Sequence, residues 1–108
     1  KAPKDCTLIP AIAYVETKLC TKGLSLAQYN CWGWGGSNEN RIWFSSFPDA
    51  IDTITRKMMA GYPQVINNPE AMQHTYCGPN CTNWGSSVTR ERNRIDNLAH
   101  KFNLPGVL

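Results

Sequence analysis

The sequence predicts a mainly α-helical protein, with about four helices and a small β or irregular lobe, stabilised by disulfides. Apolar residues recur at helical spacing in long segments of the 108-residue chain. A glycine- and asparagine-rich stretch at 21–45 interrupts this pattern, and five cysteines are many for so short a chain. A chain of this length forms one modest core, so a single domain is expected over residues 1–108.

The first helix is predicted over residues 7–20. Thr7 is the expected N-cap, and Pro10 falls in the first turn, where a missing N–H is tolerated. Glu16 is the one acidic residue among the apolar positions of this segment. The apolar stripe at helical spacing consists of Leu8, Ile12, Val15 and Leu19.

Residues 21–45 are predicted to be irregular, or a loop with one hairpin. They include YNCWGWGG at 29–36 and SNEN at 37–40, in which glycine and asparagine favour turns over regular structure. Tryptophan rings and glycine-exposed backbone are concentrated there. We expect this stretch to be the working surface of the protein.

Two further helical segments follow. Ser46 begins a sequence that resembles a capping box and predicts a helix that ends at Gly61. Asn68 and Pro69 are expected to open a short helix over 70–76, because proline at the first helical position loses no hydrogen bond.

The last helix is predicted from Ser86 until shortly before Pro105, with Val88, Ile95 and Phe102 recurring every seven residues. Its basic residues are interpreted as a solvated face; they are Arg90, Arg92, Arg94 and Lys101. Aromatic residues are not interleaved with these arginines as a nucleic-acid stacking platform requires.

The overall charge and hydropathy narrow the class of protein further. Lys and Arg number 11 against 8 Asp and Glu, a formal net charge of +3 without a concentrated basic run, which mildly favours an anionic partner. No apolar run approaches the roughly 18 residues of a membrane span. We therefore expect a monomer that binds neither nucleic acid nor membrane.

The cysteines indicate an oxidising compartment, so a secreted or cell-envelope protein is expected, present here as a processed form or an excised domain. Their odd number leaves at least one thiol unpaired. Cys6 and Cys20 would lie roughly 20 Å apart across a helix and should not pair. Several pairings remain open; Cys20–Cys31 and Cys77–Cys81 are preferred. Zinc would need a further ligand beside a C-x-x-x-C spacing, so neither a metal nor another cofactor is expected.

Four motifs follow one another along the chain: AIAYVETKLC, YNCWGWGG, WFSSFPDAIDTI and TYCGPNCTNWGSSV. This order resembles the lysozyme-like superfamily, in particular its bacterial glucosaminidase and lytic transglycosylase branch, over about residues 8–88. The matching positions are Glu16, Asn30, Trp32, Gly33, Phe44, Ser45 and Ile51. The chain departs from the family at Cys20, where glycine is usual, and at Cys31 inside the loop. A bridge between these two cysteines would tie the helix end to the loop.

The resemblance implies an α+β lysozyme-like domain that cleaves β-1,4 bonds of peptidoglycan or a related N-acetylated polysaccharide. Glu16 would be the general acid, because a glutamate desolvated against tryptophan can hold its proton near neutral pH. Residues expected at the sugar cleft are Asn30, Trp32, Trp34 and Tyr76, with Trp84 as a further wall. Glu39 is the candidate for a second carboxylate. Hydrolysis and 1,6-anhydro formation remain open.

Plainer interpretations stand beside these. Glu16 could be a surface carboxylate that pairs with a lysine, and at least one of Trp32, Trp34 and Trp43 is expected in the core. The chain could also be a secreted module that binds sugar without turnover, or a disulfide-stabilised protein that uses its tryptophan loop against another protein.

Overall fold

The computed structural model describes residues 2–36 and 40–102, with side chains described from Thr7 onwards. Within these ranges the chain forms five helices and no strand. They are α1 (Ala2–Thr17), α2 (Gly23–Ala27), α3 (Phe47–Gly61), α4 (Pro69–Tyr76) and α5 (Trp84–Lys101). The prediction of a mainly helical protein is confirmed. The stretch 21–45 is irregular where it is described, apart from the short helix α2, which was not predicted.

The predicted bounds of the first helix are wrong at both ends. α1 begins at Ala2, so Thr7 lies inside the helix and is buried instead of capping it. The Thr7 hydroxyl accepts a hydrogen bond of 3.1 Å from Arg92 Nε of α5, a tertiary partner that the local sequence does not reveal. Pro10 also lies inside α1, where it removes one backbone hydrogen bond. The helix ends at Thr17, before Cys20.

The starts of α3 and α4 confirm the predicted caps. The Ser46 hydroxyl accepts a hydrogen bond of 3.1 Å from the backbone N–H of Asp49, and the Asn68 side chain accepts one of 3.3 Å from the backbone N–H of Ala71. Each cap satisfies a backbone donor that the first helical turn leaves unpaired.

α5 begins at Trp84, slightly before the predicted Ser86, and ends at Lys101. Arg90 and Arg94 are exposed as expected. The interpretation of Arg92 as a solvated residue is wrong, because its side chain is buried against α1 and the segment before α4. Helical spacing alone places Arg92 four residues after the buried Val88, on the inward face.

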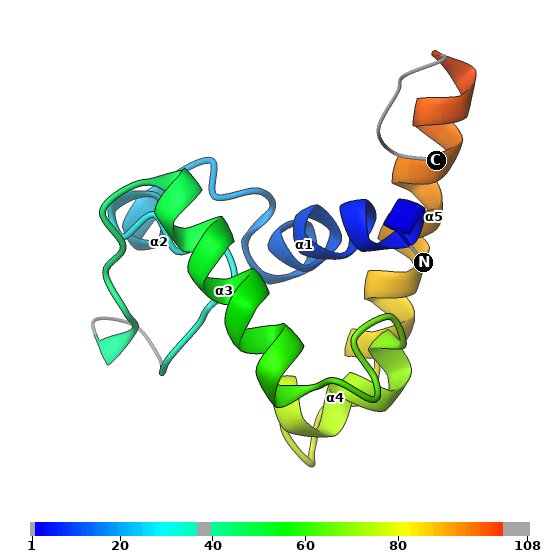
Figure 1. Ribbon diagram of the computed structural model, residues 1–108. Helices are drawn as coiled ribbons and strands as arrows, with labels where there is room; N and C mark the ends of the chain where they lie inside the picture. The colour runs from blue at the N-terminus through cyan, green and yellow to red at the C-terminus, as the bar shows by residue number, and fades with distance from the viewer. Residues whose placement is uncertain (1, 37–39, 103–108) are drawn as a thin grey trace.

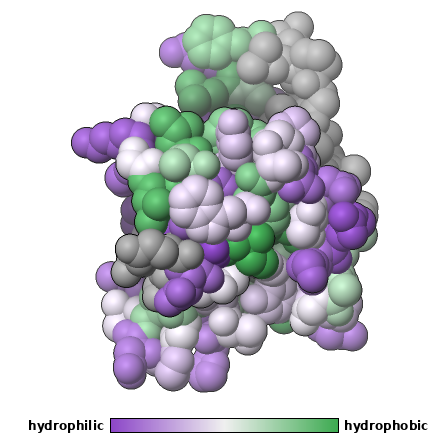
Figure 2. Space-filling model, turned by 90° about the vertical axis from the view of Figure 1, so that its left-hand side faces the viewer, coloured by the Kyte–Doolittle hydropathy of each residue, from purple (hydrophilic) through white to green (hydrophobic). Residues whose placement is uncertain are grey.

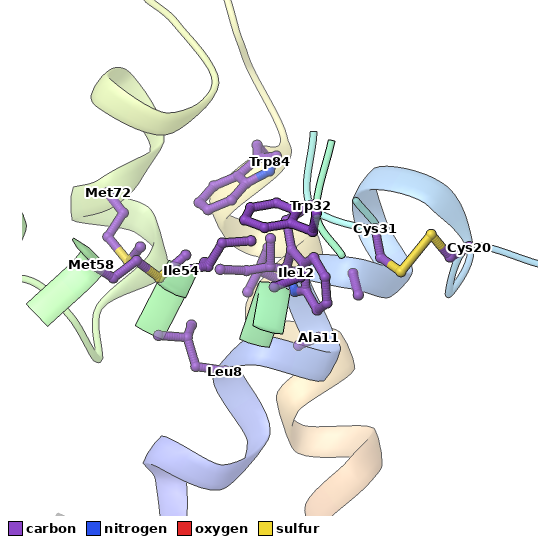
Figure 3. Close-up of a cluster of buried hydrophobic side chains, with 14 residues drawn as sticks. Leu8, Ala11, Ile12, Cys20, Cys31, Trp32, Ile54, Met58, Met72 and Trp84 are labelled. Carbon is purple, nitrogen blue, oxygen red and sulfur yellow. A yellow bond between two sulfur atoms is a disulfide. The ribbon is translucent and has the colours of Figure 1, made fainter. Parts of the chain in front are cut away.

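α1 lies at the centre of the fold, with α5 packed across it and α4 packed on α5 (Figure 1). α3 crosses α1 in the same view, and its inward side chains join the same buried cluster. Figure 3 shows Trp32 and Trp84 above Ile12, with Met58 and Met72 to one side and the disulfide between Cys20 and Cys31 to the other. Main members from the helices are Leu8, Ala11, Ile12, Ala50, Ile54, Met58, Met72, Trp84 and Val88.

Both preferred cysteine pairings are confirmed. Cys20 is bonded to Cys31, and Cys77 to Cys81. The first disulfide is buried in the core cluster and joins the segment after α1 to the tryptophan loop. The side chain of Cys6 lies outside the described residues. None of the helices in the described chain is long and apolar enough to cross a membrane.

Candidate active site

Glu16 lies in the last turn of α1, half-buried against the start of α5. Its Oε2 accepts a hydrogen bond of 2.8 Å from the indole Nε1–H of Trp84, which is itself 5% exposed. A buried indole N–H can only donate a hydrogen bond and therefore needs an acceptor, which the Glu16 carboxyl group supplies. The acid is therefore held in one orientation by a residue 68 positions away in the sequence.

The environment of Glu16 raises its pKa above the ordinary value of 4.5. Burial is the largest cause, because it disfavours the ionised form. The hydrogen bond from Trp84 and the positive charge of Arg41 act in the opposite direction and favour the carboxylate. The carboxyl group therefore keeps its proton to a higher pH than a solvated glutamate, while the carboxylate is supported once the proton has left.

The chain turns sharply after Glu16. Lys18, Leu19 and Cys20 adopt φ values of 55°, 65° and 61°, a left-handed turn built without glycine. Each such residue costs about 1–2 kcal/mol relative to right-handed backbone. The Thr17 hydroxyl donates to the backbone carbonyl of Cys31 over 2.9 Å and accepts from the backbone N–H of Cys20 over 3.0 Å. These bonds and the Cys20–Cys31 disulfide fix the helix end against the tryptophan loop.

Asn30 organises the tryptophan loop from inside. Its side-chain amide donates to the carbonyls of Trp34 (2.9 Å) and Ile42 (3.0 Å), and its Oδ1 accepts from the Trp34 N–H (3.0 Å). Asn30 is 0% exposed. The expectation that Asn30 contacts the sugar is therefore wrong for this structure, because its amide is consumed by the backbone of the loop; it positions Trp34 instead.

Trp32 belongs to the core and not to the groove wall. The side chain is 3% exposed, and its indole N–H donates to the carbonyl of Ile9 over 3.0 Å. Trp32 is therefore a core tryptophan, as expected for at least one of the three. The expectation that the Trp32 ring stacks on a sugar is wrong. Its backbone still serves the site, because the carbonyl of Trp32 accepts a hydrogen bond of 2.7 Å from the Tyr76 hydroxyl.

Tyr76, at the end of α4, connects the acid to the loop. Its ring stacks on Trp84 with centroids 4.8 Å apart and contacts Trp34 at 5.7 Å. Burial raises the pKa of Tyr76 well above 10.0, and the negative charge of Glu16 adds to this effect. The phenol therefore stays neutral, and its hydroxyl donates a hydrogen bond to the Trp32 carbonyl.

A polar groove of about 330 Å³ opens along the loop. Its lining residues are Gly33, Trp34, Gly35, Gly36, Tyr62, Thr75 and Tyr76. Glu16 is not part of this lining but lies directly behind Gly33, since a Cβ on Gly33 would be 3.3 Å from Glu16 Oε1. With no side chain at Gly33, only its backbone lies between the carboxyl group and the groove, whose aromatic walls are Trp34 and Tyr76.

A larger groove of about 630 Å³ lies on the other side of Trp32, between α1 and α3. It is lined almost wholly by apolar side chains, which include Ile9, Leu19, Phe47 and Ile51, and it contains no titratable group. Apolar side chains are also exposed on the face of the molecule that carries α2 (Figure 2), among them Leu24 and Leu26. We place no chemistry in this larger groove, because it offers no acid and few hydrogen-bonding groups.

The structure thus places Glu16 and Trp84 behind a groove that Trp34 and Tyr76 line. Trp43, from the same loop, is 57% exposed. Glu39, the candidate second carboxylate, lies outside the described residues. In the part of the chain that is described, no carboxylate is among the residues that line the groove.

Three contributors to the site were not predicted: Arg41, Tyr62 and Thr75. Arg41 follows the SNEN stretch and has no spacing relationship to Glu16, so the sequence carries no signal for it. Tyr62 is the C-cap residue of α3, directly after Gly61, where the sequence indicated only that the helix ends. Thr75 directly precedes Tyr76, so its place beside a predicted cleft residue was the available signal.

Comparison of the chain with protein-family models, curated proteins and solved structures found no match. Groups of three or more His, Cys, Asp or Glu side chains that could hold a metal ion do not occur among the described residues.

Proposed function

We propose that this chain is a lysozyme-like glycosidase that cleaves β-1,4 bonds in peptidoglycan glycan strands, with Glu16 as general acid. The observation that carries the proposal is the half-buried carboxyl group of raised pKa behind Gly33, at the edge of a groove with aromatic walls. Cleavage of a glycosidic bond needs a proton donor at the leaving oxygen, and such a donor works best when its pKa lies near the ambient pH.

In the proposed reaction, protonated Glu16 gives its proton to the bridging oxygen as the bond from that oxygen to the anomeric carbon breaks. Glu16 then carries a negative charge, which the Trp84 N–H and the Arg41 guanidinium stabilise. The electron-deficient anomeric carbon is captured by an oxygen of the substrate, either the neighbouring acetamido carbonyl or the 6-hydroxyl. Water completes hydrolysis in the first case, and a 1,6-anhydro sugar leaves in the second. The proton that the water or the 6-hydroxyl loses in this step returns to the Glu16 carboxylate and restores the acid.

The walls of the groove suit a sugar chain. The Trp34 and Tyr76 rings offer flat surfaces to pyranose C–H groups, and the backbone of Gly33, Gly35 and Gly36 is open to hydrogen bonding with acetamido groups. The disulfides fit the proposed secreted or cell-envelope location.

Substitution of Glu16 by glutamine tests the proposal. The native chain should clear purified cell walls and release soluble fragments, and Glu16→Gln should lower this rate by about a hundredfold or more while binding to the walls persists. Glu70→Gln is the matched control, because Glu70 is exposed and outside the groove, and it should keep native activity. Mass spectrometry of the fragments identifies the bond that is cut and any 1,6-anhydro end.

A non-catalytic sugar-binding module is the second candidate. It is favoured by the single carboxyl group at the groove, because a conventional two-carboxylate enzyme needs a partner for it. Cell-wall binding by the native chain without any released fragment would support the module and contradict the enzyme.

A further inference from the structure

Arg41 holds a guanidinium group close to Glu16 without forming an ion pair with it. The positive charge of Arg41 lowers the pKa of Glu16, yet the ion pairs of the described residues lie elsewhere, at Arg56 and Arg94. Nη1 donates one long hydrogen bond of 3.4 Å to the Ser25 hydroxyl, and the buried Nε has no partner. A guanidinium carries five N–H donors, so most of the hydrogen-bonding capacity of this group is unused.

Gly33 lies between Glu16 and Arg41 on one side and the groove on the other. A Cβ at Gly33 would lie 3.3 Å from Glu16 Oε1 and 3.6 Å from Arg41 Nη2. Both polar groups therefore lie next to Gly33, which lines the groove. A ligand that brings a glycosidic oxygen to Glu16 would bring the neighbouring substituents of the sugar to Arg41.

Arginine in this position suits a carboxylate, because its planar fork can donate two parallel hydrogen bonds to the two oxygens of such a group. In peptidoglycan, N-acetylmuramic acid carries a lactyl group on O3, next to the β-1,4 linkage on O4. The lactyl carboxyl is an amide when the stem peptide is attached and a free carboxylate when the peptide has been removed. Chitin has no such group.

We propose that Arg41 binds the free lactyl carboxylate of N-acetylmuramic acid, so that the groove selects glycan strands from which the peptide has been removed. This inference rests on the glycosidase function proposed above. It also implies that the protein acts after another reaction, the hydrolysis of the amide bond that joins the stem peptide to the lactyl group, since that reaction exposes the carboxylate.

The test compares two ligands that differ in one group: a tetrasaccharide of alternating N-acetylglucosamine and N-acetylmuramic acid with free lactyl carboxylates, and the same tetrasaccharide with these carboxylates as methyl amides. Calorimetry on the native chain should show affinity for the free acid higher by about tenfold or more, as expected for a hydrogen-bonded charge. Arg41→Gln should remove this preference and leave the affinity for the amide within about twofold. Arg56→Gln, an exposed arginine on α3, is the control and should keep the preference.

A pair of glycine substitutions tests the role of Gly33 beside Arg41. Gly33 and Gly23 have φ values of +63° and +78°, so alanine imposes a similar backbone strain at both, but nothing lies within 4 Å of a Cβ on Gly23. Gly33→Ala should reduce the preference for the free acid, and Gly23→Ala should keep it. If Arg41→Gln does not fold, the native comparison of the two ligands still decides.

Equal affinity of the native chain for the two tetrasaccharides would overturn the inference, as would a preference that survives in Arg41→Gln. Turnover of both ligands with equal kcat/KM would overturn this inference and leave the glycosidase proposal intact. A clear preference in binding without any turnover would overturn the glycosidase function and leave the recognition of the carboxylate standing.

Discussion

Burial and two polar neighbours shift the pKa of Glu16 in opposite directions. Desolvation raises the pKa, while the Trp84 hydrogen bond and the Arg41 charge lower it. Such a balance suits a group that must hold a proton in the free protein and release it during the reaction. Neither neighbour is near Glu16 in the sequence, so the sequence indicates Glu16 as the candidate acid but not the groups that shift its pKa.

Trp84→Phe should move the alkaline limb of the pH–activity profile to higher pH. A general acid works in its protonated form, so activity falls as pH rises through the pKa of Glu16. The indole N–H lowers that pKa, and phenylalanine keeps an aromatic ring beside Tyr76 but removes the donor. Trp43→Phe, at an exposed position, is the matched control and should leave the limb in place. A limb that stays or moves to lower pH in Trp84→Phe would contradict the assigned role of the indole.

At the scale of elements, the site depends on how the end of α1 is joined to the loop before α3. Three residues of left-handed backbone follow α1, and the Thr17 hydroxyl and the Cys20–Cys31 disulfide hold them. The turn is made without glycine, and a covalent bond to the loop helps to hold its strained backbone.

Replacement of both Cys20 and Cys31 by serine should lower stability by about 3 kcal/mol through loss of the cross-link, and should reduce activity because Glu16 and the loop are no longer tied together. Thermal melting and wall clearing measure the two effects. Cys77→Ser with Cys81→Ser is the control, since it removes the more exposed disulfide. It should keep most of the activity. Unchanged melting temperature and activity without the Cys20–Cys31 bond would refute this role.

The elements show where local sequence patterns succeed and where they fail. The caps at Ser46 and Asn68 were predicted correctly, because a side chain bonding to a backbone N–H three residues away is a local interaction. The predicted cap at Thr7 was wrong, because its hydroxyl bonds to Arg92, 85 positions away. The short α2 was missed because its five residues form barely more than one turn of an otherwise irregular segment.

At the scale of the whole molecule, Arg92 joins three parts of the chain. Its guanidinium bonds to Thr7 of α1 and to both the backbone carbonyl (3.0 Å) and the side-chain oxygen (3.3 Å) of Asn67, just before α4. These bonds fix α5, and with it Trp84, relative to α1. A residue far from the groove thereby helps to place the acid and its indole partner.

Arg92→Leu should lower stability by about 2–4 kcal/mol, because it removes the hydrogen bonds that a buried guanidinium donates to Thr7 and Asn67. For a chain of this size the melting temperature should fall by about 10 °C or more. Arg90→Leu, at an exposed position on the same helix, should change it little. A native melting temperature in Arg92→Leu would show that apolar packing alone fixes α5 on α1.

By itself the sequence determined the helical class, the starts of α3 and α4, and Glu16 as the candidate acid, and it favoured the two disulfide pairings that the structure contains. These follow from apolar periodicity, capping, cysteine spacing and an acidic residue in an apolar stripe, all of which are local. Tertiary structure alone decided that Asn30 and Trp32 support the loop, that Trp84 holds the acid, and that Arg41 lies beside it. The reason is physical: a side chain takes its role from the partner it meets after the helices pack, and that partner is often far away along the chain.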